Sequence, residues 1–177
     1  MKRLAPIFGG IALVCLAIMG LGLALPGTWE AEQTFEFQQE PADLFPFLSD
    51  LARWEAWTVW SDFESVVSDP SAGPGATRHW DDANYGEGRV ELVEVVPLTL
   101  VRYRVEIEQG SAWVNGEIVL SKTAVGTRVT WSESGDFGWN PLMGFMARRM
   151  PASQRMQMLE GLERLSGAFA EATTDGR

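Results

Sequence analysis

The chain has 177 residues, of which 46% are hydrophobic, with 24 acidic and 14 basic side chains, one cysteine and one histidine. Residues 1–27 contain no acid, so the rest of the chain, about the size of one domain, has 12 basic and 24 acidic side chains and a net charge of −12. A domain with this net negative charge repels the negatively charged phosphates of nucleic acid. Cys15 alone cannot form an intrachain disulfide or a zinc site. We therefore expect no nucleic-acid binding, no metal and no cofactor.

The N-terminus is an apolar segment. An uncharged run of 19 residues, Ile7–Leu25, follows Lys2 and Arg3, and as a helix it would span about 30 Å, the thickness of a bilayer's hydrocarbon layer. We predict a transmembrane signal anchor over residues 1–27, with membrane contact through residues 4–25.

A cleaved signal peptide is the alternative, with Gly22 and Ala24 as the small residues before the cut. The anchor is favoured because the run exceeds the usual length of a signal core and because Leu25-Pro26 is a poor start for a mature chain. In either case the positive-inside rule leaves the N-terminus in the cytoplasm and places the globular domain outside the cytoplasmic membrane.

Residues 28–96 are predicted to alternate strands, turns and one short helix. Alternating apolar residues predict a strand over Thr28–Gln38, and Pro41 begins a helix that runs to Arg53 with apolar residues at helical spacing. Three more strands are predicted over Phe63–Ser68, Ala76–Asp82 and Arg89–Val96, the last with a bulge near Val93.

The clearest pattern in the chain lies in Leu100–Glu108. Val101, Tyr103, Val105 and Ile107 alternate there with charged residues, which predicts a strand with one apolar and one solvated face. The same alternation continues through Val114, Ile118 and Leu120 and through Val129 and Trp131. The middle of the chain is therefore predicted to be an antiparallel meander with one apolar face.

A long helix is predicted at the C-terminus. Asn140 and Pro141 suit an N-cap and the first helical position, and the pattern continues to about Ala172, with Pro151 as a point where it could break. Met158, Leu162, Leu165 and Phe169 form an apolar stripe. Gly161 would let a bulky group approach the helix. The methionines between Met143 and Met158 are either core residues or an adaptable wall for apolar ligands.

This order of elements resembles the helix-grip fold of the START-like (SRPBCC) superfamily, and more narrowly its bacterial polyketide cyclase/dehydrase-like proteins. Four segments carry the resemblance: Pro41–Phe45; Leu51–Trp57; Gly75–Trp80 with Gly86–Gly88 after it; and Gly126–Trp131. It implies an α+β domain over residues 28–175, in which a curved antiparallel sheet of about 6–7 strands wraps around the C-terminal helix. It also implies a deep, largely apolar cavity between the two.

Ten residues are candidates to line that cavity. They are large or apolar and fall on the predicted inner faces: Trp54, Trp57, Trp60, Trp80, Tyr103, Val105, Ile118, Trp131, Met158 and Leu162. Trp54, Trp57 and Trp60 form either a wall of the cavity or a core corner where a short helix packs on the sheet. A buried indole N–H needs an acceptor in either case.

No set of residues has the spacing of a catalytic site. Tyr103 points inward by phase, so its hydroxyl either contacts a ligand oxygen or lies at the rim of the core. His79 is out of phase with Trp80 and is expected on the solvated face, although a general base at that place is an alternative. We therefore predict no catalytic residues.

Three functions remain. The favoured one is a membrane-tethered binding or carrier protein for an apolar small molecule or lipid held between the sheet and the C-terminal helix. The second is a cyclase/dehydrase-type enzyme, which would need polar groups converging in the cavity. The third is a non-catalytic interaction module whose cavity is filled by its own side chains, which the eight tryptophans and nine phenylalanines favour. The oligomeric state is left open.

Overall fold

The computed structural model describes residues 5–58, 60, 63–84, 86–138 and 141–175. Its elements are α1 (Ala5–Ala24), β1 (Thr28–Phe37), α2 (Pro41–Leu48), the 3₁₀ helix η1 (Leu51–Ala56), β2 (Ser65–Val67), β3 (Thr77–Asp82), β4 (Gly86–Val96), β5 (Leu100–Ile107), β6 (Ala112–Thr123), β7 (Gly126–Asp136) and α3 (Pro141–Asp175). The N-cap predicted at Asn140 lies outside the described residues.

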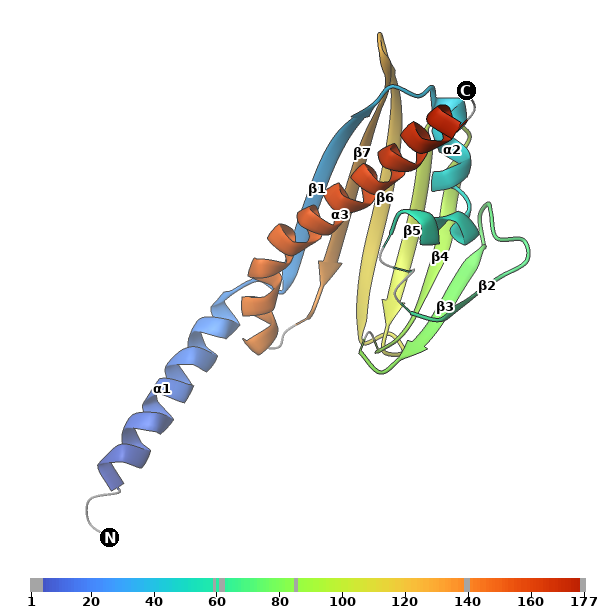
Figure 1. Cartoon of the computed structure of the whole chain (residues 1–177). Helices are drawn as coiled ribbons and strands as arrows, with labels where there is room; N and C mark the ends of the chain where they lie inside the picture. Colours follow the sequence, from blue (N-terminus) through green and yellow to red (C-terminus); the bar gives the residue numbers. More distant parts are fainter. Residues whose placement is uncertain (1–4, 59, 61–62, 85, 139–140, 176–177) are drawn as a thin grey trace.

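The seven strands form one antiparallel sheet in the order β1-β7-β6-β5-β4-β3-β2 (Figure 1). Strands β2 to β7 are a meander in chain order, and β1 returns to pair with β7. The sheet and the long C-terminal helix confirm the predicted α+β helix-grip architecture. The β4–β5 register shifts between Leu92 and Glu94, which confirms the bulge predicted near Val93.

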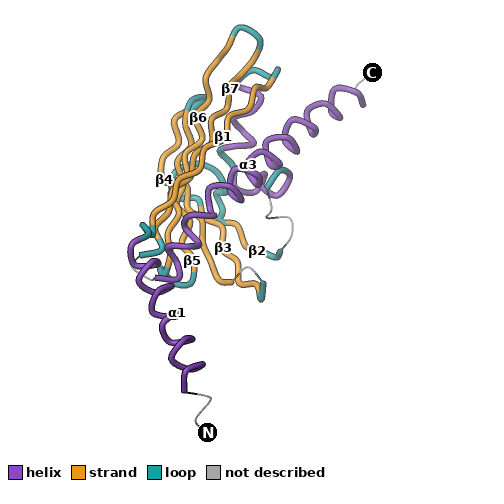
Figure 2. The backbone as a smooth tube through the Cα atoms, turned by 90° about the vertical axis from the view of Figure 1, so that its left-hand side faces the viewer, coloured by secondary structure: helices purple, strands orange, loops and turns teal. Residues whose placement is uncertain are grey.

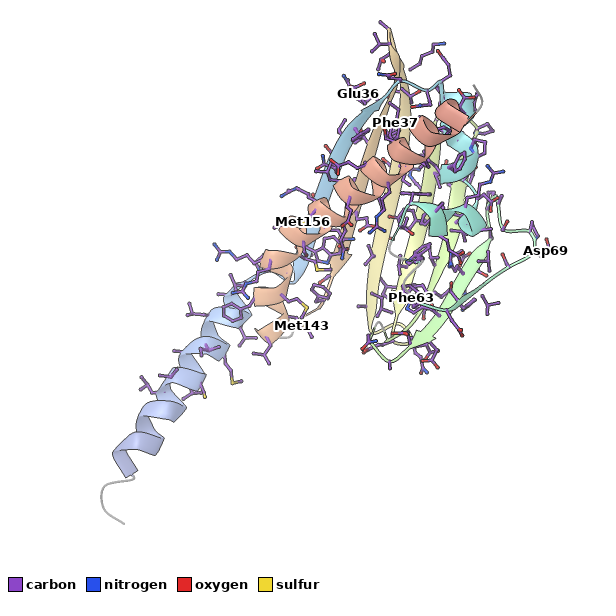
Figure 3. All side chains as sticks on the ribbon, viewed as in Figure 1. Glu36, Phe37, Phe63, Asp69, Met143 and Met156 are labelled. Carbon is purple, nitrogen blue, oxygen red and sulfur yellow. The ribbon has the colours of Figure 1, made fainter. Side chains whose placement is uncertain are left out.

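The two faces of the sheet differ as the alternation predicts. On β5, Val101 and Tyr103 are buried, whereas Arg102 and Arg104 are exposed. On β1, Glu36 is exposed at the outer edge of the molecule (Figure 3), whereas its neighbour Phe37 is buried in the core. The inner face therefore supplies the core.

Helix α3 crosses the inner face diagonally and lies on one side of the sheet (Figure 2). Its stripe of Met158, Leu162 and Leu165 is buried in the core, and Pro151 does not end the helix. A Cβ atom at Gly161 would lie 2.9 Å from the carbonyl oxygen of Trp57. The glycine therefore permits the close approach that the sequence predicted.

The predicted helix from Pro41 to Arg53 is divided in two. Helix α2 ends at Leu48, where the hydroxyl of Ser49 binds the carbonyl of Phe45, and Asp50 caps η1 by accepting from the N–H of Ala52 at 3.0 Å. The division turns the chain so that Trp54 and Trp57 enter the core.

Helix α1 extends away from the sheet and meets the domain at the start of α3 (Figures 1 and 2). The contact is close at Gly144, where a Cβ atom would lie 2.8 Å from that of Leu25 and 2.9 Å from the carbonyl oxygen of Gly22. Within the described chain, no helix combines the length and the apolarity needed to cross a bilayer. The transmembrane anchor predicted over residues 1–27 is therefore not supported.

Candidate functional site

Half of the inner face is closed by its own side chains. Trp57, Ile118, Met158 and Leu162 have no solvent-accessible surface, and Trp54 has almost none. The aromatic rings contact one another there: Trp54 lies 5.0 Å from Tyr103 and Trp57 lies 5.4 Å from Trp131, measured between ring centroids. A side chain without accessible surface cannot line an open cavity, so this half is packed as a core.

A polar cluster of four side chains lies at the boundary of the closed half. The indole N–H of Trp131 donates to the hydroxyl of Tyr103 at 2.7 Å, and that hydroxyl donates to one carboxyl oxygen of Glu133. The side-chain amide of Gln154, on α3, donates to the other carboxyl oxygen. We call these four residues, Trp131, Tyr103, Glu133 and Gln154, the polar cluster.

Burial alters the acid–base properties of this cluster. Desolvation raises the pKa of Glu133 above that of an ordinary carboxyl group, although the donated hydrogen bonds oppose the rise. Burial and the neighbouring carboxylate raise the pKa of Tyr103 well above its ordinary value of 10.0. Tyr103 therefore stays a neutral donor at physiological pH, and it is not an activated base.

The other half of the inner face remains partly accessible. Val105 and Val114 pair across β5 and β6, and both keep some exposed surface, as do Phe137 and Met150. These four apolar side chains pack against the edge of the buried core. On β7, Glu133 pairs with Gly116 and Gly135 pairs with Val114 of β6, so Glu133 of the polar cluster is two residues along the same face from the partner of Val114. Polar and apolar groups meet in this way in sites for small, mostly apolar molecules.

The structure thus separates the ten predicted cavity residues into groups. Trp54, Trp57, Ile118, Met158 and Leu162 belong to the closed half, and Tyr103 and Trp131 to the polar cluster. Val105 lies on the accessible half. Trp60 and Trp80, whose ring centroids are 6.1 Å apart, lie toward the β2–β3 edge.

The sequence reasoning missed Glu133 and Gln154. Both residues lie at positions that the periodic patterns of the sequence assign to the buried face. Glu133 follows Val129 and Trp131 in the inward phase of β7, and Gln154 precedes Met158 by four residues on the buried stripe of α3. A polar residue in an apolar phase is thus the signal that could have found them.

Arg78 is a second buried polar residue that the sequence reasoning left without a role. Its side chain is fully buried and donates to the carbonyl of Leu51 at 3.1 Å, to the hydroxyl of Ser65 at 2.7 Å and to the carboxylate of Glu55. Burial lowers its pKa, and the charge of Glu55 opposes this effect. These contacts hold η1 against β3 and β2, so Arg78 serves the fold.

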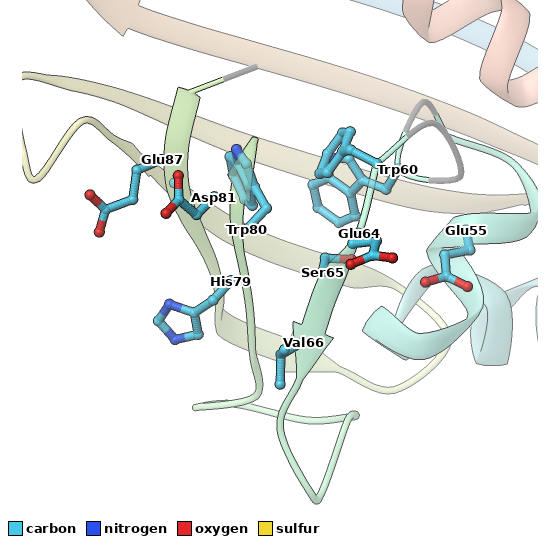
Figure 4. A pocket seen from close by; sticks show the side chains of 11 residues that line it. Glu55, Trp60, Glu64, Ser65, Val66, His79, Trp80, Asp81 and Glu87 are labelled. Atoms are coloured by element: carbon cyan, nitrogen blue, oxygen red, sulfur yellow. The ribbon is translucent and has the colours of Figure 1, made fainter. Parts of the chain in front are cut away.

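An open groove of about 840 Å³ lies at the β2–β3 edge (Figure 4). Glu55, Glu64, Asp81 and Glu87 line it together with His79 and the aromatic residues Trp60, Phe63 and Trp80. His79 is exposed, as predicted from its phase. Because four carboxylates line the groove, it suits an apolar ligand less well than the inner face does.

The described residues include no group of three or more histidine, cysteine, aspartate or glutamate side chains placed to hold a metal ion.

A curved antiparallel sheet that grips a long C-terminal helix, with polar groups on its apolar inner face, defines a START-like helix-grip protein. The chain belongs to the family described as "Polyketide cyclase / dehydrase and lipid transport", whose model matches residues 28–168. No curated protein sequence matches the chain.

Solved structures share the fold. Protein MLL2253 from Mesorhizobium loti is 15% identical, with a TM-score of 0.62 over 80% of this chain and 97% of its own. Mll3558 from Rhizobium loti is 25% identical, with a TM-score of 0.51 over 79% and 94%. The di-domain ARO/CYC StfQ from the steffimycin biosynthetic pathway is 14% identical, with a TM-score of 0.58 over 84% of this chain and 52% of its own.

Proposed function

We propose that this protein binds an apolar small molecule or lipid on the accessible half of the inner face, with the polar part of the ligand beside Glu133 and Gln154. The observation that carries the proposal is the position of the polar cluster. Glu133 is the one buried acidic side chain among the described residues, and burying a carboxyl group costs free energy that a packed apolar core would avoid. A ligand with a polar end would make use of it.

A binding function fits the cluster better than catalysis does. The hydroxyl of Tyr103 both donates and accepts a hydrogen bond, and both oxygens of Glu133 accept one. The high pKa of Tyr103 opposes a phenolate. Every hydrogen-bonding atom of Tyr103 and Glu133 in the polar cluster thus already has a partner within the protein.

Native mass spectrometry of the full chain, combined with solvent extraction of the same sample, tests the proposal. We expect an apolar adduct that disappears when Val114 is replaced by tryptophan, because that side chain would fill the accessible half. Val66→Trp is the matched control, since Val66 is exposed on β2, outside the inner face. A wild-type protein without an adduct, and with no mass shift after incubation with lipids, would instead favour an interaction module with a filled cavity.

An enzyme of the cyclase/dehydrase type is the second candidate, and the raised pKa of Glu133 favours it. A carboxyl group that holds its proton closer to neutral pH can act as a general acid on a ligand oxygen. This candidate predicts that Glu133→Gln abolishes turnover of a polyketone and leaves its binding intact. Equal turnover of the polyketone by wild-type protein and by Glu133→Gln would contradict the enzyme candidate.

The proposal also includes a lipid surface as the source of the ligand. It is supported by the exposed apolar side chains of α1, among them Leu13, Leu16 and Leu21, and by the exposed pair Arg148 and Arg149 near the start of α3. The pair would favour anionic headgroups. Flotation with anionic vesicles should fall when both arginines are replaced by glutamate, and flotation with neutral vesicles should not change. If the double variant floats with anionic vesicles as well as wild-type protein does, Arg148 and Arg149 do not contact the headgroups.

A further inference from the structure

The face of the sheet opposite α3 (Figure 2) carries a polar depression that follows β7. On this outer face β7 presents the small residues Ser132 and Ser134, both half-buried. The strands on either side present longer, exposed side chains at the paired positions, namely Glu30 and Glu32 on β1 and Asn115 on β6. Small residues between longer ones leave a depression, and we call the one formed by these five residues the outer trough.

Two hollows of about 510 Å³ and 630 Å³ lie in the outer trough. Most of the residues that line them face outward by the phase of their strands. Both hollows are lined by Glu30, Asn115 and Ser134, so they are continuous. Ser132 lines one hollow and Asp136 the other, four residues further along β7, so together they follow the strand for about 14 Å. Each volume is within the range of roughly 300–1,000 Å³ typical of small-molecule sites.

Trp113 lies at one end of the outer trough. It is 41% exposed, it pairs with Asp136 of β7, and it lines the smaller hollow. The guanidinium of Arg104, on β5, lies over the indole at 5.7 Å from the ring centroid. Strand β5 is on the side of β6 away from β7, so this cation–π contact supports the ring from outside the trough. The trough therefore ends at an aromatic surface that is held in place and accessible.

Hydrogen-bonding groups of the outer trough are available to a ligand. Within the described ranges, the side chains of Glu30, Glu32 and Ser134 make no hydrogen bond or ion pair. Asn115 uses its amide oxygen to accept from Nε of Arg104 at 3.3 Å, and its amide nitrogen is a donor. Carboxylates only accept, the amide nitrogen donates, and the serine hydroxyl does both. Donors and acceptors thus lie beside one another.

We infer that the outer trough binds a neutral oligosaccharide, with one sugar ring against Trp113 and further hydroxyls on Glu30, Glu32 and Asn115. A hydroxyl both donates and accepts a hydrogen bond, so it matches neighbouring carboxylates and amides. The C–H groups of a sugar ring fit the electron-rich face of an indole. The site is on the opposite side of the sheet from the proposed apolar ligand, and neither site depends on the other.

The charges around the outer trough favour a neutral chain. Glu30 and Glu32 line the larger hollow together with the exposed arginine Arg155, and Asp136 lines the smaller hollow beside Trp113, which carries Arg104 on its ring. Side chains of both signs therefore surround the ligand. A polyanion would meet the carboxylates and a polycation would meet the arginines, whereas a neutral, hydroxyl-rich chain can use both as hydrogen-bonding partners.

Isothermal titration calorimetry of the full chain with cellohexaose, maltohexaose and chitohexaose tests the inference. We expect one or more of these neutral hexasaccharides to bind, and Trp113→Ala to weaken that binding roughly tenfold. Ser134→Tyr places a ring in the middle of the outer trough and should abolish binding. Thr130→Tyr is the matched control, because Thr130 is on the same face of β7 and lines neither hollow. Aromatic residues suit a strand, so both tyrosine variants should fold.

Wild-type protein supplies a second readout. In a ¹H–¹⁵N spectrum, the indole N–H signal of Trp113 should shift when the hexasaccharide is added. Failure of wild-type protein to bind any of the three hexasaccharides would overturn the inference, and so would binding that Ser134→Tyr and Thr130→Tyr reduce equally. Binding of spermine in place of the sugars, lost in Ser134→Tyr, would assign the outer trough to a cation and would also overturn the inference.

Discussion

Tyr103 lies directly over Gly116 on the neighbouring strand, where a Cβ atom at residue 116 would overlap the carbon atoms of its ring. The same arrangement holds Trp80 over Gly88 and Trp29 over Gly135. In each pair the missing side chain makes room for an aromatic ring on the inner face. The large residues of this face are therefore positioned by glycines as much as by their own packing.

Gly116→Ala should displace Tyr103 and break its hydrogen bonds to Trp131 and Glu133. Overpacking of a core typically costs about 1–3 kcal/mol, and we expect a loss of stability in that range or above it in urea unfolding. Gly167→Ala is the control, because a Cβ atom there meets nothing within 4 Å on α3 and should stabilise the helix by about 0.5–1 kcal/mol. If Gly116→Ala leaves the free energy of unfolding unchanged, the strands must shift enough to accommodate the added methyl group.

Trp131→Ala should destabilise the protein by about 3–5 kcal/mol, the usual cost of removing a large core aromatic side chain. Trp131 is buried, its ring contacts Trp57, and its N–H binds Tyr103. Chemical denaturation monitored by circular dichroism would measure the change. A loss below about 1 kcal/mol would indicate that Trp131 borders open space rather than core.

Glu133→Gln should change how stability depends on pH. The pKa of Glu133 is raised in the folded protein, so its protonated form is the one that folding favours. This contribution is fully present below the unfolded-state pKa of about 4.3, and it is lost as the pH rises through the higher folded-state pKa. The stability of wild-type protein relative to Glu133→Gln should therefore fall across that window. A difference that is constant with pH would contradict the raised pKa.

Arg78→Ala and Glu55→Gln should have unequal effects although the two residues form one ion pair. Removing Arg78 leaves the buried carbonyl of Leu51 without this donor and empties a buried volume, so we expect a loss of about 2–3 kcal/mol. Glu55 is 56% exposed, and its replacement should cost less than about 1 kcal/mol. Thermal unfolding of the two variants side by side would measure this, and equal losses would mean that the ion pair itself determines the effect.

Much of this architecture could be predicted from alternation and helical spacing. The run from Val101 to Ile107 identified the inner face, and the stripe from Met158 to Leu165 identified the buried side of α3. Periodicity could not show how far side chains fill the space between them, because that depends on contacts between residues far apart in the sequence. Trp57 and Gly161 are 104 positions apart, and a Cβ atom at Gly161 would lie 2.9 Å from the carbonyl oxygen of Trp57, so this close contact between η1 and α3 could not be read from local patterns.

The polar cluster was harder to predict for a related reason. Glu133 is in the inward phase of β7, but a single polar residue at the end of an apolar alternation also suits a strand that leaves the core. Only the hydrogen bonds to Tyr103 and Gln154, on two other elements, show that Glu133 stays inside. The transmembrane prediction was based on the length and apolarity of Ile7–Leu25, and the structure does not support it.

The strand order has a consequence for folding. Strand β1 leaves the ribosome before all the other strands, yet its partner β7 is nearly one hundred residues further along the chain. Contacts between such distant segments form slowly, because a long loop must close first. During synthesis, the meander from β2 onward can assemble from local hairpins. The apolar side chains of β1, Trp29, Phe35 and Phe37, stay exposed until β7 is available to pair with β1. Strand β1 is therefore synthesised first but is the last strand to pair with the sheet.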